Sequence, residues 1–482
     1  MSNVQPHVAE KSATYEVLKQ LERSAPWPRV PLTKAVDLNP KPERGSLSDD
    51  LEVSFVPMAA VEARTGVIDT STVRKYAEVK KGYTYFRDGD VLFAKITPCM
   101  ENGKMAVARQ LRNGIGFGST EFHVLRPREG VDAHFVYYFV SNARFRAEAA
   151  HHMTGAVGQK RVPAAFLEQS EIPLPPIDEQ RRIVAEMEKQ FSRLDGAVAN
   201  FKRVNASLRR FKAAVLKAAV EGRLVPTEAE LAGRDGRSYE SGAQLLQRVL
   251  ETRRRQWKGK GEYKEPAGPN TSILPKLPQG WVWATVEQLT WLVTSGSRGW
   301  GDFYSEAGVL FIRAQDIKTD ALCLSGVARV AIPANAEGTR SSVGANDILV
   351  TITGANVTKS ALLPPLPEQG FVSQHVALLK LNLAETAAFV FNWIVSPSNG
   401  RKTLEALAYG AGKPGLSLEQ IRALHVALPP LPEQRRIIAE LERRLSVVQR
   451  IDAEVLDSLS RIGVLKGSVL SSAFSANTGD DK

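Results

Sequence analysis

Few residues of this 482-residue chain stand in patterns that catalyse reactions. An amino-methyltransferase needs an Asn/Asp-Pro-Pro-aromatic loop to hold the target amine, but every Pro-Pro pair here follows a leucine. The segment GAGKPG, Gly410 to Gly415, fits G-x-G-x-x-G, yet it follows an expected helix instead of a strand and contains Pro414. We therefore reject a dinucleotide site. Because no G-x-x-x-x-G-K-[ST] segment is present either, nucleotide hydrolysis is disfavoured, and we expect no catalytic residue.

Metal ligands are also hard to find in the sequence. His151 and His152 are adjacent but lack an HExxH frame and nearby cysteines, so surface or loop histidines are favoured over metal ligands. Glu78 and Lys80 form the E-x-K arrangement that nucleases use, yet no Pro-Asp precedes them at a suitable distance. We expect no metal site.

Charge and cysteine usage limit the class of protein. The chain has 63 Lys and Arg against 52 Asp and Glu, a net charge of +11, which favours polyanions such as nucleic acid or a membrane surface. Cys99 and Cys323 are the only cysteines, which excludes a disulfide framework and fits a reducing compartment. No apolar run approaches the roughly 18 residues of a membrane span. We expect a soluble, cytoplasmic protein.

An internal repeat organises the chain. LPPIDEQRRIVAEMEKQFS begins at Leu174 and LPPLPEQRRIIAELERRLS at Leu428, with 12 of 19 aligned positions identical. The same offset aligns FKAAVLKAAV from Phe211 with LKGSVLSSAF from Leu465, and GDVLFAKIT from Gly89 matches NDILVTIT with small slips. Since the period far exceeds that of solenoid repeats, we predict a duplicated domain plus a helix.

Both copies of the repeat predict a long helix with a coiled-coil seam. Apolar residues recur in steps of three and four from Met187 to Val215 and from Leu441 to Val469. Asn205 and Asp452 interrupt these seams, either as plain defects or as pins that select one register. We expect each helix to run about 45 residues, or roughly 65 to 70 Å. Gly222 is expected to end the first helix, and Asn477 or Gly479 the second.

The globular parts of the repeat read as mixed α+β units. In the first copy, DVLFAKIT and EFHVLRP predict strands, DAHFVYYFVSNARFRAEAA one amphipathic helix, TGAVGQKR a loop and EIPLP a final strand. The second copy repeats this order. The fold class is therefore α+β, with two pseudo-repeated domains joined and separated by two long helices that form an antiparallel coiled coil. The expected segments are a 1–25 arm, a 26–175 domain, a 176–222 helix, a 223–275 linker with a short helix, a 276–428 domain, a 429–475 helix and a 476–482 tail.

The 223–275 segment is interpreted as a linker. It contains a short helix, GAQLLQRVLETRRRQW, followed by a stretch rich in Gly, Pro and Lys. Its basic residues could contact phosphate, but a solvated flexible connector is the favoured interpretation.

Two similar but non-identical domains at a fixed separation suit two-part recognition of DNA. If each domain reads a short base sequence in the major groove, a stiff spacer sets the distance between half-sites, ideally about one helical turn of roughly 10 bp. Because the domains differ, the target is expected to be asymmetric.

These residues resemble the specificity (S) subunits of type I restriction-modification systems. The resemblance rests on the paired LPPIDEQRRIVAEMEKQF and LPPLPEQRRIIAELERRL segments, on YTYFRDGDVLFAKITPCMENGK and GSTEFHVLRP, and on PQGWVWATVEQL from Pro278. It implies two target-recognition domains, with the helices acting as a ruler and as a docking surface. It also implies two modification subunits, which hold S-adenosylmethionine and methylate adenine N6, and two restriction subunits, which use ATP and magnesium. This chain itself would need no cofactor and would not be an enzyme.

Candidate DNA-binding residues follow from charge, loop position and the repeat. Lys and Arg can hold phosphate or guanine, Asn and Gln can pair with adenine, and Glu can accept from cytosine. The first domain offers Lys95, Thr97, Asn102, Lys104, Thr120, Glu121, Gln159, Lys160 and Arg161. The second offers Arg298, Arg313, Thr351, Asn356, Lys359, Gln374, His375 and Lys413. For any one of them, an ordinary solvated side chain or a loop-stabilising hydrogen bond is an equally good interpretation.

For partner docking, the resemblance points to the starts of the two helices. The candidates are Glu179, Gln180, Arg181, Arg182, Glu433, Gln434, Arg435 and Arg436. Two other functions remain open: a self-contained fused DNA methyltransferase or restriction enzyme, which the missing catalytic loop disfavours, and a coiled-coil assembly scaffold whose positive charge is incidental. The second domain lacks the ITPCMENGK loop and has ITGANVTKS instead, so its half-site is expected to differ.

Overall fold

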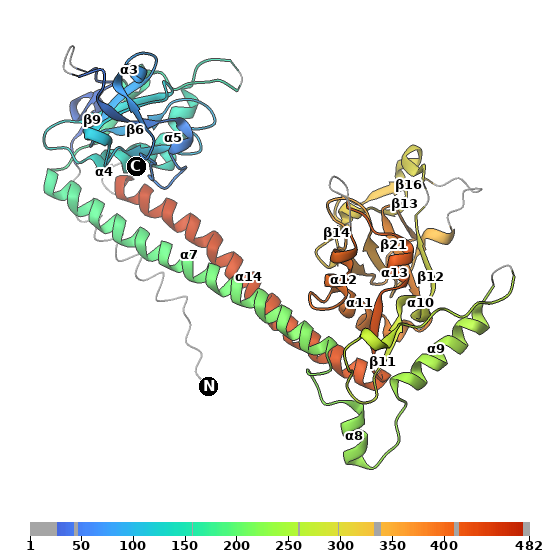
Figure 1. Ribbon diagram of the computed structural model, residues 1–482. Helices are drawn as coiled ribbons and strands as arrows, with labels where there is room; N and C mark the ends of the chain where they lie inside the picture. Colours follow the sequence, from blue (N-terminus) through green and yellow to red (C-terminus); the bar gives the residue numbers. More distant parts are fainter. Residues whose placement is uncertain are drawn as a thin grey trace, which may run out of the picture. The chain divides into compact units, whose positions relative to one another are not determined.

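The computed structural model describes residues 27–42, 47–156, 158–258, 261–296, 298–331, 339–408 and 414–475. Its chain separates into two compact units. Unit 1 comprises Met1–Lys202 with Val455–Lys482, and unit 2 comprises Arg203–Glu454. Each unit therefore holds one globular domain and one part of each of two long helices (Figure 1).

Two four-stranded sheets form the globular part of unit 1. The first has the order β2-β9-β6-β7, from Val36–Leu38, Phe122–Pro127, Val91–Ala94 and Met105–Val107. The second has the order β4-β3-β8-β5, from Val73–Lys75, Glu52–Val56, Ile115–Gly118 and Thr84–Arg87. The helices are α2 (Leu32–Ala35), α3 (Tyr76–Val79), α4 (Ala133–Ser141), α5 (Ala143–His151) and α6 (Ala164–Gln169), and a third sheet pairs β1 (Arg29–Pro31) with β10 (Glu171–Pro173).

Unit 2 is built on the same plan. Its sheets have the orders β12-β21-β18-β19, from Thr290–Ser295, Val376–Leu381, Ile348–Thr351 and Ser360–Leu362, and β16-β13-β20-β17, from Ala328–Val330, Tyr304–Ile312, Gly370–Val372 and Ser342–Val343. Two small sheets pair β11 (Val282–Thr285) with β22 (His425–Leu428), and β14 (Ile317–Lys318) with β15 (Ala321–Leu322). The helices are α8 (Glu228–Asp235), α9 (Gly242–Gln256), α10 (Val286–Leu289), α11 (Ala387–Val395), α12 (Gly400–Leu407) and α13 (Leu418–Arg422).

Apart from the β14–β15 sheet, which among the described residues only unit 2 has, the two domains match strand for strand. In each, the second sheet contains one parallel pair, β3 with β8 in unit 1 and β13 with β20 in unit 2, whose registers place Phe55 opposite Phe117 and Phe311 opposite Phe371. The remaining neighbours in both sheets are antiparallel. The predicted fold class, two repeated α+β domains with two long helices, is confirmed.

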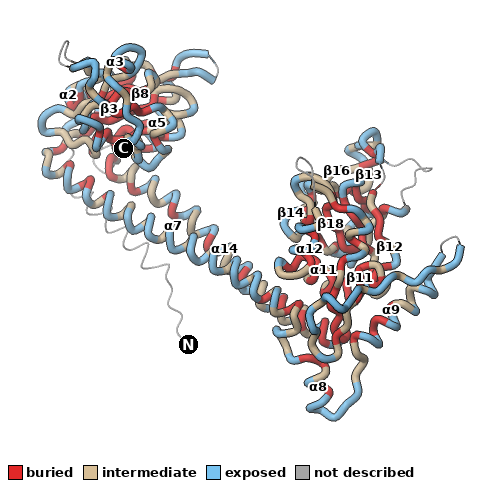
Figure 2. Tube along the Cα trace, viewed as in Figure 1, coloured by how far each residue is buried: buried red, intermediate tan, exposed pale blue. Residues whose placement is uncertain are grey.

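Buried central strands hold each domain together. In β6, Val91 and Phe93 face the core that contains α4 and α5, while Leu92 and Ala94 face a second core on the other side of the sheet. Because successive strand residues point to opposite faces, an unbroken apolar run indicates a strand covered on both sides. β18 of unit 2 is covered in the same way (Figure 2).

The two long helices pair within each unit. They are α7 (Ile177–Val220) and α14 (Leu431–Ser475). In unit 1 the beginning of α7, at Met187, shares a core with the end of α14, at Phe474. In unit 2 the end of α7, at Val215, shares a core with the beginning of α14, at Leu441. In both units the beginning of one helix packs against the end of the other, so the helices are antiparallel.

The seam of α14 repeats every seven residues. Leu441, Val448, Val455, Ile462 and Val469 are all buried, which is the heptad spacing of a coiled coil. Asp452 interrupts this seam and accepts a hydrogen bond of 2.8 Å from Lys212 of α7. For Asp452, this contact favours the register-pin interpretation over a plain defect.

Helix ends and breaks depend on local hydrogen bonding. Gly222, with a φ of 69°, lies two residues after Val220, the last residue of α7, and the next amide, of Arg223, bonds back to the Ala218 carbonyl. Asn477 and Gly479 lie outside the described residues. The single helix expected over DAHFVYYFVSNARFRAEAA is wrong: Asn142 divides it into α4 and α5, because its side chain accepts from the Phe145 amide and donates to the Phe139 carbonyl, both at 2.8 Å.

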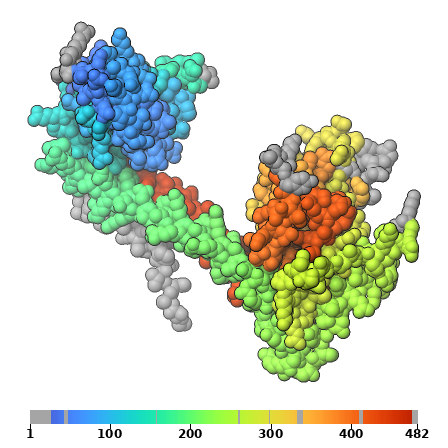
Figure 3. All heavy atoms as spheres, in the orientation of Figure 1, coloured from blue at the N-terminus to red at the C-terminus, as the bar shows by residue number. Residues whose placement is uncertain are grey.

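The segment interpreted as a flexible connector is largely structured. Leu245, Leu246 and Val249 of α9 are buried in the core of unit 2, so this helix is anchored to the domain. The preceding helix, α8, was not expected from the sequence. Figure 3 shows this yellow-green part of the chain on the surface of unit 2. Among the described residues, no helix has both the length and the hydropathy needed to cross a bilayer.

Candidate nucleic-acid interface

The candidate residues of unit 1 converge on one edge of the domain, where three segments meet. The amide of Lys95, just after β6, bonds to the Glu121 carbonyl at 2.9 Å, and the Lys95 carbonyl accepts from Val162 at 2.8 Å. The Thr97 amide bonds to the Lys160 carbonyl at 2.9 Å. Backbone hydrogen bonds therefore hold the end of β6, the turn before β9 and the loop after α5 against one another.

Unit 2 repeats this backbone arrangement with different side chains. The amide of Ile352 bonds to the His375 carbonyl at 3.0 Å, and the Gly354 amide bonds to the Pro414 carbonyl at 3.1 Å. His375 thus occupies the place of Glu121, and the bridge between Thr353 and Gly415 replaces the one between Ile96 and Arg161. The same backbone arrangement therefore carries a different set of polar side chains in each unit.

An ion pair dominates the edge of unit 1. The Arg161 guanidinium contacts the Glu121 carboxylate through Nε at 2.9 Å and Nη2 at 2.8 Å, and its Nη1 donates to the Gln159 carbonyl at 3.0 Å. The hydrogen bond from Arg161 lowers the pKa of Glu121, although partial burial opposes the shift. Nearby His123 is buried, and burial lowers its pKa, while its Nε2 lies 2.9 Å from the Val162 carbonyl. Both side chains help to fix the 159–162 loop.

The other candidates of unit 1 fall into two groups. Lys104 donates from Nζ to the Met58 carbonyl at 3.0 Å, and Thr97 Oγ1 contacts Glu101, so these two side chains are used inside the domain. In contrast, four candidates have exposed positions around the converging loops: Asn102, Thr120, Gln159 and Lys160. Lys95 is partly exposed beside them.

In unit 2 three candidates line one cavity. It has a volume of about 360 Å³, and Arg313, Gln374 and His375 contribute to its wall. Gln374 Nε2 lies 3.2 Å from His375 Nε2. Arg298 is exposed nearby in sequence but does not line this cavity. The cavity thus joins the turn before β21 to the segment that follows β13.

The cavity also contains residues that the sequence analysis missed. Trp300 stacks on Phe311 with ring centroids 5.4 Å apart, and the exposed ring of Tyr304 stands at the rim. Ser373 is 6% exposed and its Oγ has no hydrogen-bond partner among the described residues. A flat apolar wall beside an unsatisfied hydroxyl and polar side chains suits a heteroaromatic edge. The aromatic residues carried no charge or repeat signal, so only the folded arrangement identifies them.

The Arg313 side chain is held by a buried carboxylate. Arg313 donates from Nε to Asp316 Oδ2 and from Nη2 to Asp316 Oδ1, each at 3.0 Å, and Nη2 also reaches the Gly326 carbonyl at 3.2 Å. Asp316 is nearly inaccessible, at 5% exposure. The hydrogen bond to Asp316 raises the pKa of Arg313, so the guanidinium is both charged and oriented.

The remaining candidates of unit 2 form a supporting network. Asn356 donates to the Ala314 carbonyl at 3.2 Å and accepts from Lys359 Nζ at 2.7 Å. Thr351 is fully buried. Asn356, supported by Lys359, stabilises the segment next to Arg313 from within the domain. Lys413 lies outside the described residues.

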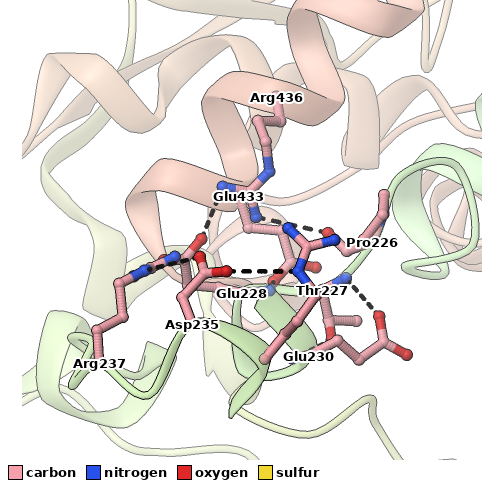
Figure 4. Close-up of polar contacts among 9 residues, drawn as sticks. Pro226, Thr227, Glu228, Glu230, Asp235, Arg237, Glu433 and Arg436 are labelled. Atoms are coloured by element: carbon pink, nitrogen blue, oxygen red, sulfur yellow. Dashed lines mark hydrogen bonds and ion pairs between the residues drawn. The ribbon is translucent and has the colours of Figure 1, made fainter. Parts of the chain in front are cut away.

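The proposed docking residues are divided by burial. Gln180 is buried and donates to the Pro175 carbonyl at 2.8 Å, and Gln434 does the same with Pro429. Glu433 is also fully buried (Figure 4). The partly or largely exposed members are Glu179, Arg181, Arg182, Arg435 and Arg436. Their docking role remains a prediction.

Comparison with known proteins identifies the domain in unit 1. Residues 39–197 match the family described as type I restriction modification DNA specificity domain. The chain is 26% identical over 502 residues to the type I restriction enzyme EcoAI specificity subunit of Escherichia coli, covering 92% of this chain and 81% of that protein. It is 28% identical over 496 residues to the EcoEI specificity subunit of Escherichia coli, with coverages of 91% and 80%.

A solved structure matches the fold over nearly the whole chain. It comes from work on the structural basis of complex assembly and conformational transition in the type I R-M system. The TM-score is 0.64 at 18% identity, and the match covers 94% of this chain and 99% of the other.

Fold, repeat and matches define the class first: the protein has two repeated α+β domains and two long paired helices, and residues 39–197 match a type I restriction modification DNA specificity domain. Over nearly its whole length, the chain is similar to the specificity subunits of type I restriction enzymes, as the sequence resemblance predicted.

Proposed function

We propose that this subunit reads a bipartite, asymmetric DNA motif, with one half-site for each unit. The proposal rests on a backbone arrangement that both units share and on side chains that differ between them. Glu121 and Arg161 in unit 1 lie where unit 2 has His375 and Gly415. Two domains with the same backbone arrangement but different hydrogen-bonding side chains are suited to reading two different base sequences. The net charge of +11 supplies the attraction to phosphate.

In this proposal the chain itself catalyses nothing. It docks modification subunits, which bring S-adenosylmethionine, and restriction subunits, which bring ATP and magnesium. The paired helices α7 and α14 serve as the spacer and as the docking surface. The complex acts in the cytoplasm, where free thiols such as those of Cys99 and Cys323 stay reduced.

Domain exchange tests the assignment of half-sites. Residues 26–175 are replaced by the corresponding domain of a relative, and the chain is expressed with its methyltransferase subunit in cells whose DNA is then sequenced for modified bases. We expect one half of the methylated motif to change and the other half to stay. A change in both halves contradicts the assignment of one half-site to each domain.

Two further results separate the alternatives. Methyl transfer by the purified chain alone identifies a self-contained enzyme. DNA affinity of the assembled complex that is unchanged from low to moderate salt identifies a scaffold, because neutralisation of phosphates makes DNA binding steeply salt-dependent.

A further inference from the structure

The starts of α7 and α14 are two copies of one local structure. The amides of Gln180 and Gln434 each bond at 3.0 Å to the second proline of the preceding pair, and their side chains each bond at 2.8 Å to the first. Glu179 therefore corresponds to Glu433, and Arg182 to Arg436. The surroundings of these two pairs differ.

In unit 2 the start of α8 covers the beginning of α14, where Glu433 and Arg436 lie. The amide of Glu228 donates to Glu433 Oε2 at 2.8 Å, and the Glu228 carboxylate accepts from Arg436 at 2.6 Å (Figure 4). Thr227 caps α8, because its side chain accepts from the Glu230 amide. Trp281 Nε1 donates to the other oxygen of Glu433 at 2.8 Å. The capped first turn of α8 thus bonds to Glu433 through the Glu228 amide and to Arg436 through the Glu228 carboxylate.

The covering buries both carboxylates of this site in unit 2. Glu433 is 0% exposed and burial raises its pKa, against the opposing hydrogen bonds from Glu228 and Trp281. Burial alone would also raise the pKa of Glu228, but hydrogen bonds from Arg237 and Arg436 outweigh it and lower the pKa. Glu228 is therefore held as a carboxylate between two guanidinium groups, which is a strong, directional contact.

In unit 1 the same groups have no such cover from the residues that the structure describes. The side chains of Glu179 and Arg182 are 26% and 49% exposed and bond to each other, with Nε to Oε2 at 2.8 Å and Nη2 to Oε1 at 2.7 Å. Among the described residues of unit 1, none supplies an amide to Glu179 or a second carboxylate to Arg182. An exposed pair of this kind contributes little to folding stability.

We propose that the start of α7 is a docking site for the first turn of a helix from a partner protein, bound as α8 is bound in unit 2. The partner turn carries a Ser or Thr cap followed by Glu, as Thr227 and Glu228 do. Its amide then bonds to Glu179, and its carboxylate bonds to Arg182. This inference rests on the docking part of the proposed function. It makes the starts of α7 and α14 unequal, because α8 already occupies the site at Glu433.

A second copy of the chain is a poorer occupant than a partner protein. The matching segment of each copy is engaged with its own α14, and releasing it would leave Glu433 without the Glu228 amide and Arg436 without its carboxylate. Buried polar groups that lose their partners carry a large desolvation penalty. The partner must therefore bring its own acidic helix start.

A peptide with the sequence of the α8 segment can serve as a probe for the site at the start of α7. A fluorescein-labelled synthetic peptide of residues 224–239 is titrated with the full-length protein, and binding is followed by fluorescence anisotropy. We expect weak, saturable binding. Arg182→Ala should weaken it by about tenfold or more, the effect of losing one charge-assisted contact, and so should Glu228→Ala in the peptide.

Two variants serve as matched controls. Arg181 is adjacent, 66% exposed and 4.0 Å from Asp178, so Arg181→Ala removes the same charge and should change the affinity by less than about twofold. Arg436→Ala should also leave it unchanged. Absence of saturable binding, or equal losses in Arg181→Ala and Arg182→Ala, overturns the inference. Loss only in Arg436→Ala shows that the peptide replaces α8, which also overturns it. None of these outcomes depends on DNA recognition.

Discussion

Each of the two candidate sites carries an arginine that a carboxylate holds in place. Glu121 holds Arg161 and Asp316 holds Arg313, each by a two-point contact. A guanidinium has five N–H donors, so hydrogen bonds within the domain leave some of them for a ligand. Fixing the side chain in advance lowers the entropic cost of reading a base. A bidentate contact between Arg and guanine O6 and N7 is the commonest specific contact in the major groove.

The first prediction concerns Arg313. Arg313→Lys keeps the charge but loses the planar fork, so we expect relaxed discrimination at one position of one half-site, by about 1–3 kcal/mol. The other half-site should keep its sequence. Modified-base sequencing of cells that express the variant with its methyltransferase subunit measures this. Arg298→Lys, at an exposed position outside the cavity, is the control. An unchanged motif in the Arg313 variant contradicts the reading role.

The second prediction is a pH dependence at Glu121. Its pKa is lowered from 4.5 by Arg161, so the ionised form contributes stability that is present above pH 4.5 and is lost as the pH falls through the lower, folded-state pKa. The difference in unfolding free energy between wild type and Glu121→Gln should stay constant from pH 7 to about 5 and then shrink. Urea denaturation at a series of pH values measures it, and a difference that grows in acid refutes the sign.

The sequence selected several residues that lie at the candidate sites, because charge and loop position were enough; their role in DNA binding stays a prediction. Glu121, Arg161 and Arg313 were found in this way. Asp316 was missed because a buried carboxylate beside a 3-10 turn has no distinguishing local pattern, and Trp300 was missed because aromatic residues more often fill cores. Lys104 was selected by its charge, but its amine is used within the domain. Sequence patterns reveal residue type, whereas the partner of a side chain depends on tertiary structure.

Among the elements, the long helices were the most predictable. Their seam repeats over many turns, so the expected length of about 45 residues agrees with the 44 and 45 residues found. Short elements were less predictable from the sequence. The break at Asn142 depends on a side chain that bonds to its own backbone, which competes with helix continuation and leaves the apolar periodicity nearly intact. α8 was missed because it has only 8 residues.

The third prediction compares two leucines of α14. Leu441 is 2% exposed in the core shared with α7, whereas Leu456 is 63% exposed. Leu441→Ala should cost about 2–5 kcal/mol of unfolding free energy, because it removes buried methyl groups and leaves a cavity. Leu456→Ala should change it by less than about 0.5 kcal/mol. Chemical denaturation of both variants measures this, and equal effects would mean that the seam is not the packed face.

At the scale of the whole molecule, duplication explains both the likeness and the difference of the two units. Strand order and register are kept because they depend on the buried alternation of apolar residues, which tolerates substitution at constant volume. Exposed loop residues carry no such constraint, so the two edges could diverge into different sets of donors and acceptors. The repeat therefore predicts the backbone arrangement of each domain but not the side chains at its edge.

The last prediction tests the helices as a ruler. Inserting three heptads into each helix, at residues 202/203 and 454/455, adds 21 residues to each and about 31 Å at 1.5 Å per residue. B-DNA rises about 3.4 Å per base pair, so the gap between the half-sites should lengthen by about 9 bp, close to one full turn of the duplex. Both half-sites then face the same side again. Methylation should move to the same two half-sites at the longer spacing.

A single heptad in each helix is the matched control. It adds about 10 Å, or about 3 bp, which turns one half-site roughly a third of the way around the duplex. The coiled-coil seam stays in register in both variants, since each insertion is a whole number of heptads. Methylation should therefore be much weaker with one heptad than with three. If modified-base sequencing shows the original spacing in both variants, the helices do not measure the distance between the half-sites.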